Sequence, residues 1–339
     1  MLNWQLWDGT AAGWDQMLLS SEDYTVFQSF SWGEHKKKTG WKPMRYYCQN
    51  KNNKTQGMAQ ILIKKLPLGL VLVWVSGGLV VHFTNFKVGK VSEVIQGLID
   101  KIYADYPCSL IRFHFHDEAS PDLAYTVNKV CLRPYVKLNT GFSVKFKLDQ
   151  SVAQMRKNMT SKHRYYSKKA TGVGLTWTVG NDDQQLAALA QIHDEMVNIK
   201  KLHFVSISLN KLQSMRDNLG DQVQIITGSL NEVPVTSCVV LLFGRKAFYM
   251  VAATGKCGRE ISAAYAMFEY LMQELISRGI TDFDFGGIDP VRKEATGVNH
   301  FKCGFGGKIV EHLGEWESAS SEKVRLVINL AIKLKGGRV

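Results

Sequence analysis

The residues best suited to chemistry lie near the C-terminus, where a lysine stands among aromatic residues and is followed closely by glycines. The run His300-Phe301-Lys302-Cys303-Gly304-Phe305-Gly306-Gly307 holds Lys302 beside Phe301. A cation in a tight, partly apolar site can stabilise an oxyanion, because weak solvent screening strengthens the attraction. The alternative is a surface lysine beside a glycine-rich strand crossing, and the local residues favour neither interpretation.

A glycine pair lies upstream of this run, in the sequence Asp284-Phe285-Gly286-Gly287-Ile288. Residues 282–285 predict a buried strand, which we expect to run into a turn at the two glycines. Glycine lets backbone come close to a ligand, because no Cβ stands in the way. The two runs together indicate a ligand site that is built partly from backbone.

A basic stretch from Met155 to Gly174 contains two tyrosines, Tyr165 and Tyr166, and no acidic residue. Such a mixture suits a polyanion, because cations neutralise phosphates and aromatic rings stack on bases. The formal net charge of +12 also favours anionic partners. The alternative is a solvated helix face. The cations of the stretch are Arg156, Lys157, Lys162, Arg164, Lys168 and Lys169.

The loop Gly255-Lys256-Cys257-Gly258-Arg259 precedes a predicted helix. Its backbone N–H groups and two cations could hold an anion, as helix N-termini do. An acyl-CoA acetyltransferase grips pyrophosphate at this place, but the full Arg-x-x-Gly-x-Gly/Ala sequence of such a loop is missing. An ordinary loop with two exposed cations is the alternative.

Two histidines, His114 and His116, share one face of a predicted strand, as the ligands of a metal would. No third ligand stands at a matching position. The six cysteines form no C-x-x-C pair and no cluster with zinc spacing. We therefore expect no metal.

The elements that must position these residues alternate between strands and helices, which is typical of an α/β (α+β) protein. The pattern runs through about 140 residues, the size of one domain, and then starts again, which suggests an internal structural duplication. The first half has predicted helices at 27–38 and 91–103 and strands at 44–48, 58–66 and 110–116. The second half has predicted helices at 154–170, 182–201, 208–218 and 261–278, and strands at 175–179, 223–228, 234–243, 246–252 and 282–285.

Two apolar segments bear on membranes. Residues 66–83 carry no formal charge, but Pro67, Gly69 and Gly77-Gly78 interrupt them, so short buried strands explain them better than a membrane span. The tail at 324–334 is apolar on one face and carries lysines. It could dock on the protein or touch a membrane surface. The N-terminus lacks the pattern of a signal peptide.

The chain resembles the Fem family, the aminoacyl-tRNA-dependent transferases that add amino acids to the peptidoglycan stem peptide. Residues 284–288 and 301–307 resemble the closing signature of that family. Gln28-Ser29-Phe30-Ser31-Trp32-Gly33-Glu34-His35-Lys36 resembles its N-terminal Q-S-x-x-W-G-x-x-K motif. The basic stretch resembles its basic helix, and residues 248–253 resemble its substrate-lining strand. The four motifs occur in the expected order.

The resemblance implies two acetyltransferase-like (GNAT) domains in tandem, with the C-terminal tail returning to the first. We expect the first domain at 1–145 together with 310–339, and the second at 146–309. Some members carry a long coiled-coil arm in the second domain. No sustained heptads occur here, so we expect no arm.

The resemblance also implies an aminoacyltransferase that joins an aminoacyl group from aminoacyl-tRNA to an amine of a peptidoglycan precursor. Lys302, with Phe301 beside it, would stabilise the transition state. Lys36, with Trp32 of the same motif, would contact the phosphates or peptide of the precursor. Tyr249 lies on the strand that would line the acceptor site.

Two further substrate-binding residues follow from the same resemblance. Arg164 belongs to the basic helix, and Lys200 belongs to the segment 198–204, where the family usually has a Thr, an Arg and an aromatic residue. Asn and Lys replace the expected types there, so the acceptor stays open between a UDP-linked and a lipid-linked muropeptide. We expect no cofactor and a cytoplasmic protein, with peripheral contact at the inner face of the membrane as an alternative.

Three other functions stay open. An acyl-CoA-dependent N-acyltransferase would bind its cofactor near Gly255–Arg259. A tRNA-dependent amide-forming enzyme could act on an acceptor outside the cell wall. A non-catalytic nucleic-acid binder would explain the charge, but it would leave the motif at 301–307 unexplained.

Overall fold

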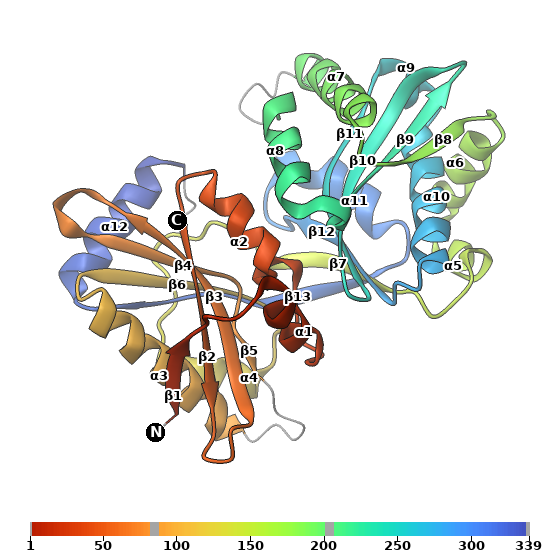
Figure 1. The fold of residues 1–339 in the computed structure, drawn as a ribbon. Helices are drawn as coiled ribbons and strands as arrows, with labels where there is room; N and C mark the ends of the chain where they lie inside the picture. The colour runs from red at the N-terminus through yellow and green to blue at the C-terminus, as the bar shows by residue number, and fades with distance from the viewer. Residues whose placement is uncertain (1, 82–87, 201–206, 337–339) are drawn as a thin grey trace. The chain divides into compact units, whose positions relative to one another are not determined.

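The computed structural model describes residues 2–81, 88–200 and 207–336, which fall into two compact units (Figure 1). Unit 1 runs to Gly141 and takes up the chain again from Val310, and unit 2 is Phe142–Ile309. The C-terminal segment therefore returns to the first unit, as the resemblance implied. The expected boundary after residue 145 falls inside strand β7 (Phe142–Lys147), which lies wholly in unit 2, where it pairs with β12.

Unit 1 contains a mixed sheet in the order β1-β2-β3-β4-β6-β13, with β5 beside β3. Neighbouring strands are antiparallel except β4 and β6, which are parallel because helix α3 crosses over between them. The strands are β1 (Asn3–Leu6), β2 (Lys42–Gln49), β3 (Thr55–Lys65), β4 (Val71–Gly77), β5 (Val80–Val81), β6 (Ser109–Glu118) and β13 (Lys308–Ala319).

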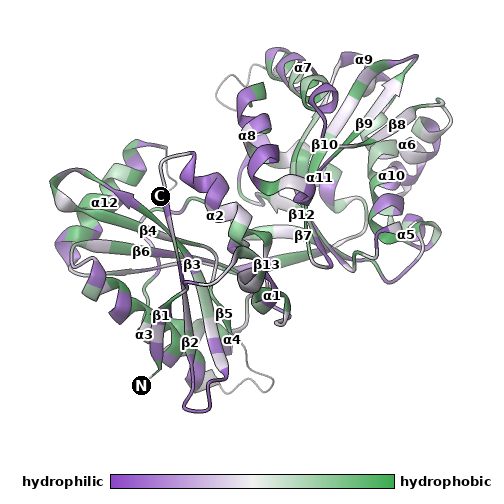
Figure 2. Ribbon diagram, in the orientation of Figure 1, coloured by the Kyte–Doolittle hydropathy of each residue, from purple (hydrophilic) through white to green (hydrophobic). Residues whose placement is uncertain are grey.

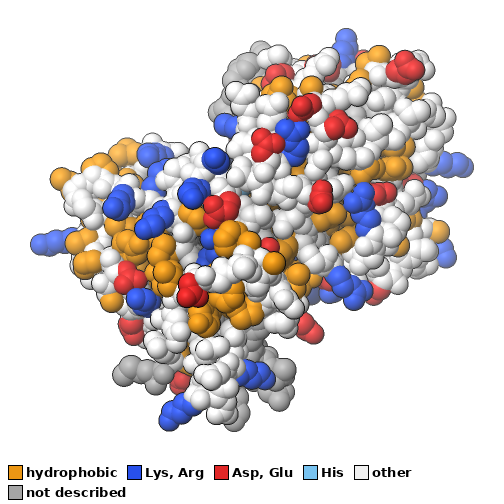
Figure 3. All heavy atoms as spheres, viewed as in Figure 1, with side chains coloured by type: hydrophobic (Ala, Val, Ile, Leu, Met, Phe, Trp, Pro, Cys, Tyr) orange, Lys and Arg blue, Asp and Glu red, His pale blue; other side chains and the backbone are white. Residues whose placement is uncertain are grey.

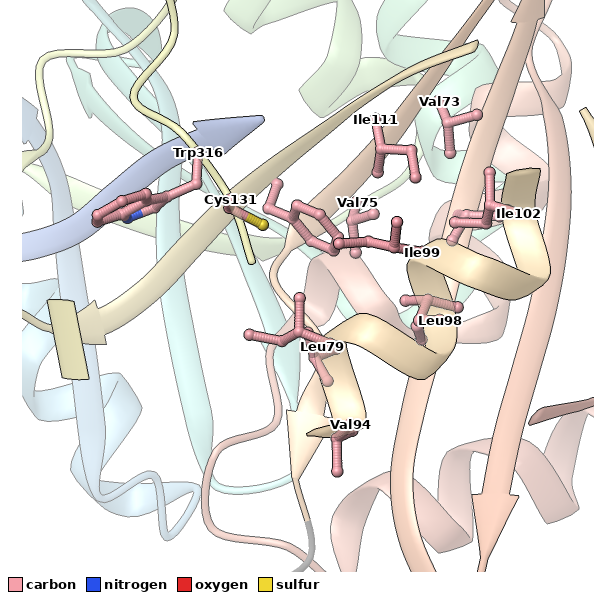
Figure 4. Packing of buried hydrophobic residues seen from close by; sticks show 14 of the residues in the cluster. Val73, Val75, Leu79, Val94, Leu98, Ile99, Ile102, Ile111, Cys131 and Trp316 are labelled. Carbon is pink, nitrogen blue, oxygen red and sulfur yellow. The ribbon is translucent and has the colours of Figure 1, made fainter. Parts of the chain in front are cut away.

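The main core of unit 1 lies between helix α3 and the sheet. The apolar residues of α3 recur at helical spacing, so they lie on one face of the helix, and this face packs on β4 and β6 (Figure 4). The helices are α1 (Ala11–Leu19), α2 (Phe30–Lys37), α3 (Val88–Asp105), α4 (Pro121–Asn128) and α12 (Glu322–Leu334). The apolar segment that begins at residue 66 forms β4 and β5, as predicted for its described part. Among the described helices, none is long and apolar enough to cross a membrane.

Unit 2 repeats this plan, with the order β7-β12-β11-β10-β9-β8. The predicted meander is confirmed, because β9, β10 and β11 are successive antiparallel neighbours. Among the described strands of this unit, β11 and β12 are the one parallel pair, and helix α10 joins them. The strands other than β7 are β8 (Thr176–Gly180), β9 (Val223–Leu230), β10 (Val233–Phe243), β11 (Lys246–Thr254) and β12 (Asp282–Ile288).

The helices of unit 2 include one correction. The single basic helix predicted at 154–170 is two helices, because Met159 is extended and the side chain of Thr160 caps the second helix at the N–H of His163. Gly279 ends α10 with a positive φ, as predicted. The helices are α5 (Val152–Asn158), α6 (Ser161–Thr171), α7 (Asp183–Lys200), α8 (Leu209–Leu219), α9 (Lys256–Glu260), α10 (Ala263–Ser277) and α11 (Thr296–Cys303).

The two units confirm the predicted α/β (α+β) class, and the shared arrangement of strands and crossover helix supports the predicted duplication. No coiled-coil arm occurs in the ranges described. Lysine and arginine side chains are scattered over the face of each unit seen in Figure 3, among fewer acidic ones. The positive charge is therefore spread over that face.

Candidate active site

The strands β11 and β12 pair over only three residues and then separate. The last pair is Phe248 with Asp284, although β11 continues to Thr254 and β12 to Ile288. On its other side β12 has a bulge against β7 between Asp284 and Gly287, and Gly286 has a φ of +79°. The turn predicted at the two glycines is therefore wrong, because the strand continues through them. The bulge interrupts the regular pairing of β12, and the carbonyl oxygen of Gly287 accepts a hydrogen bond from α11.

Lys302 reaches this bulge from helix α11. Its Nζ donates a hydrogen bond to the carbonyl oxygen of Gly287 at 3.0 Å. It lies 5.6 Å from the ring centroid of Phe285 and 6.0 Å from that of Tyr249. A Cβ on Gly286 would stand 3.2 Å from the Nζ, so only glycine leaves the ammonium group its present place. The bulge therefore explains the glycine at position 286.

Burial controls the charge of Lys302. It lowers the pKa of the ammonium group to about 8, and the nearby Asp284 carboxylate opposes the shift. Asp284 is held in turn, because its Oδ1 accepts the N–H of Gly286 at 2.8 Å. With a pKa of about 8, roughly nine-tenths of the lysine side chains are protonated at pH 7. The site therefore presents a weakly solvated cation.

Aromatic rings surround the lysine on its own helix and on both strands. The ring of Phe301 meets those of Tyr265 and Phe305 edge-on, at 5.3 Å and 5.0 Å between centroids. The ring of Tyr249 meets Phe285 at 4.8 Å. Burial raises the pKa of Tyr249 well above its ordinary value, so its hydroxyl stays neutral. The structure thus brings together three of the predicted residues, namely Lys302, Phe301 and Tyr249.

His163 is a residue of this site that sequence reasoning missed. Its ring is fully buried, and Nε2 lies 3.0 Å from the carbonyl oxygen of Phe301. Nδ1 lies 2.8 Å from the hydroxyl of Thr160. Burial lowers the pKa of His163, so the ring is neutral, and Nε2 must carry the proton because a carbonyl only accepts. A Cβ on Gly304 would overlap the ring, so the glycine leaves room for it.

His163 therefore links helix α6 to helix α11 by a hydrogen bond to Phe301, the residue that precedes Lys302. In the sequence it is one more basic residue in a basic stretch. Its partner stands 138 residues away, so no local pattern indicates the contact.

The cations of the basic stretch divide into two groups. Arg156 pairs with the buried carboxylate of Glu269. The guanidinium of Arg164 donates to the carbonyl oxygens of Lys157 and Met159 and to the hydroxyl of Ser161, so it holds the break between α5 and α6. Substrate binding by Arg164 stays a prediction. The remaining cations, Lys157, Lys162, Lys168 and Lys169, are exposed, as is Tyr165.

In unit 1, Trp32 and Lys36 form a pair on helix α2. Trp32 is buried against Phe27, with 4.9 Å between ring centroids. Lys36 Nζ lies 4.5 Å above the indole, and burial lowers the pKa of this lysine. The buried indole N–H has no hydrogen-bond partner among the described residues. A cation beside an unused donor suits an anionic or carbonyl-rich ligand.

Two other predicted features have different outcomes. Glu195 occupies the loop before α9: its Oε1 accepts the N–H of Lys256 at 2.9 Å, and its carboxylate fills the space that Gly255 leaves. The sequence left an anion site and an ordinary loop open here, and in the structure the protein's own carboxylate lies against the loop. Lys200 ends α7, but its side chain and residues 201–206 lie outside the described residues.

Around the histidine pair of β6, the described residues include no group of three or more His, Cys, Asp or Glu side chains that could hold a metal ion. His116 Nε2 lies 3.3 Å from His114 Nδ1. Burial lowers the pKa of His114 to about 4, so this ring is neutral at physiological pH.

An open pocket of about 430 Å³ lies along one flank of α11. Three basic side chains face it, Arg292, Lys293 and His300, and Cys303 reaches it from beside the lysine. Its lining suits an anionic group. The full lining is Pro290, Val291, Arg292, Lys293, Thr296, Asn299, His300 and Cys303.

Comparisons with known proteins show which sequences this chain resembles. Residues 181–331, which include Tyr249 and Lys302, match the model of the FemAB family. A lipid II:glycine glycyltransferase of Staphylococcus aureus is 33% identical over 87 residues, which are 25% of this chain and 19% of that protein. The match therefore spans about a fifth of the length of that relative.

Solved structures confirm the fold. A crystal structure of FemX superposes with a TM-score of 0.83 at 17% identity, over 96% of this chain and 100% of that one. A tandem GNAT protein from the clavulanic acid biosynthesis pathway superposes with a TM-score of 0.55 at 10% identity, over 95% and 99%. The predicted fold of two acetyltransferase-like units is thereby confirmed.

Proposed function

We propose that this chain, which matches the FemAB family model over residues 181–331 and has the fold of FemX, forms an amide bond between an aminoacyl group carried by tRNA and an amine of a peptidoglycan precursor. The observation that carries the proposal is the position of Lys302. Its ammonium group is half-buried at the point where β11 and β12 separate, with glycine backbone on one side and aromatic rings on the other. Such a cation suits a reaction in which an oxyanion develops.

In the proposed reaction the acceptor amine attacks the carbonyl carbon of the aminoacyl ester. The carbonyl oxygen becomes anionic, and Lys302 stabilises it. The ammonium group has three N–H donors, and the hydrogen bond to Gly287 uses only one of them. The C–O bond to the ribose then breaks, the new C–N bond remains, and the ribose oxygen receives the proton that the amine loses. His163 contributes by holding the backbone of Phe301, and through it α11.

Two features of unit 2 support tRNA as the donor. The exposed lysines of α5 and α6 with Tyr165 suit a phosphate backbone and a stacked base. The pocket beside α11, which is lined by Arg292, Lys293 and His300, offers further basic side chains to an anionic donor. The position of Glu195 disfavours acyl-CoA as the donor, because its carboxylate lies where the pyrophosphate of CoA would contact the loop before α9. A tRNA donor would place the reaction in the cytoplasm.

The acceptor proposed is a muropeptide precursor. The name of the Staphylococcus aureus relative gives lipid II as its substrate. In unit 1, Lys36 and the unpartnered indole N–H of Trp32 would meet the phosphates or the peptide of such a precursor. The UDP-linked and the lipid-linked precursor share both groups.

The test incubates the purified protein with a charged tRNA pool and with UDP-linked and lipid-linked muropeptides, and reads product masses. Lys302→Met should abolish the amide product, whereas Lys211→Met, on the exposed side of α8, should leave it unchanged. Full turnover by Lys302→Met would disprove the role of the lysine. A tRNA-dependent product on another acceptor would keep the donor and reject the cell-wall precursor. Transfer from acetyl-CoA would reject the donor.

A further inference from the structure

Helix α12 has apolar residues on both faces, because Val324, Ile328 and Ile332 are buried in the core beneath it while other apolar residues point outward. Arg325 and Asn329 face the sheet and are 8% and 2% exposed. Leu330 and Leu334 face outward and are 58% and 80% exposed. A helix that only covers a sheet would place its apolar residues inward and its polar residues in water. Figure 2 shows hydrophobic residues along α12. The outer face of α12 therefore needs its own explanation.

A buried ionic network fixes the rotation of α12. Glu317 of β13 accepts from Arg325 Nε at 2.7 Å and from Arg112 Nη2 at 2.9 Å. Arg112 also donates to Asn329 at 2.9 Å and to Glu315 at 2.8 Å. A turn of the helix about its axis would leave these buried charges without partners, at a large cost. The outer face is thus held outward, and its exposure does not come from loose docking.

The outer face is a continuous apolar stripe. Leu326, Leu330 and Leu334 are spaced at i, i+4 and i+8, so they lie in line, and Val327 lies beside them. The docking face comprises these four exposed residues: Leu326, Val327, Leu330 and Leu334.

Charge decides which partner fits the docking face. Lys323, Lys333 and Lys335 lie on or next to the stripe and are exposed, and no acidic residue occurs from Lys323 to Leu334. Long lysine side chains beside an apolar stripe match a bilayer whose surface carries negative charge. In a contact between two copies of the chain the lysines of one copy would face those of the other. Lipid is therefore the better partner.

We propose that the docking face binds the surface of a membrane that contains anionic lipid. The leucines would enter the boundary between headgroups and acyl chains, and the lysines would meet the headgroups. This binding does not depend on the proposed transfer reaction. If the chain both binds membranes and catalyses the proposed transfer, the membrane contact favours a lipid-linked over a nucleotide-linked acceptor. Only this preference for an acceptor rests on the proposed function.

The test is flotation of the full chain with vesicles, with no tRNA and no muropeptide present. We expect binding to vesicles of phosphatidylcholine and phosphatidylglycerol, weakened by salt, and little binding to phosphatidylcholine alone. The double variant Leu326→Gln/Leu330→Gln should lose at least about tenfold in affinity. Each of Lys323→Gln and Lys333→Gln should lose about fivefold. Val233→Gln, an equally exposed apolar residue of unit 2, is the matched control and should bind normally.

Three results would overturn the proposal: equal binding by the double leucine variant, no binding of the parent chain to anionic vesicles, or self-association of the parent chain that the leucine variant abolishes. Unfolding by urea shows whether the variants are folded. The substituted leucines are about half exposed, so the midpoint should stay close to that of the parent chain. Product formation with a soluble precursor, measured separately, tests the proposed function without the membrane.

Discussion

The pH dependence of the proposed reaction gives the sharpest test of Lys302, because two roles of a lysine predict opposite slopes. With a pKa of about 8, the ammonium form falls from roughly nine-tenths at pH 7 to half at pH 8. If the ammonium group stabilises the oxyanion, kcat/KM should fall about fivefold from pH 8 to pH 9 and about tenfold per unit above that. If the free amine were a general base, kcat/KM would instead rise through pH 8.

Two substitutions test whether the fall of kcat/KM above pH 8, the alkaline limb of the pH profile, is caused by Lys302. Lys302→Arg keeps a cation whose pKa lies above the measured range, so the limb should disappear while some activity remains. Lys302→Met should lower kcat about 100-fold or more, the usual loss on removing one oxyanion donor. Initial rates of amide formation are measured from pH 6 to about pH 10, with spontaneous hydrolysis of the aminoacyl ester subtracted. A limb near pH 8 that persists in Lys302→Met would refute the assignment.

The same pKa predicts a change in stability that needs no substrate. Burial lowers the pKa of Lys302 from 10.5 to about 8, so between these values the unfolded chain binds the extra proton and the folded chain does not. The free energy of unfolding contributed by this group therefore rises as pH increases from about 8 to 10.5. Lys302→Met should remove that rise, and urea unfolding at pH 7.5 and pH 10 measures it.

Three further predictions concern packing and positioning. His163→Phe keeps a ring but loses the hydrogen bond that holds α11, so kcat should fall more than KM rises. A loss of stability of ~1–3 kcal/mol with unchanged kcat would contradict a positioning role. Gly304→Ala, just after α11, should destabilise by about 2 kcal/mol or more, because its Cβ meets a buried ring, whereas Gly297→Ala within α11 meets nothing and should stabilise by up to ~1 kcal/mol; equal unfolding midpoints would contradict this. Glu317→Gln should cost ~3–5 kcal/mol, because it weakens a carboxylate buried between two arginines, whereas the half-exposed Glu322→Gln should cost under about 1 kcal/mol; similar Tm values would argue against the network.

Local patterns predicted most elements of the fold. The apolar spacing of α3, the three strands of the meander and the glycine that ends α10 each follow from interactions within about ten residues. The two incorrect predictions also have local causes that the sequence contains. The basic helix breaks at Met159–Thr160 because Thr160 is a capping residue, and a capping side chain competes with helix continuation.

The predicted turn at Gly286-Gly287 failed for a different reason. A glycine pair is compatible with a turn and with a bulge inside a strand. Pairing with β7 on one side of β12 keeps the strand extended through Ile288, and this pairing joins residues more than a hundred positions apart. Only the partner strand decides between the two conformations.

By itself, the sequence determined which residue types surround Lys302, the order of the strands and helices, and the presence of an apolar stripe on the C-terminal helix. The tertiary structure alone decided where β11 and β12 separate, that His163 holds the backbone next to the lysine, and which face of α12 points outward. The reason is physical: these features rest on burial and on hydrogen bonds between distant segments. The lowered pKa of Lys302 belongs with them, since desolvation exists only once the chain has folded around the side chain.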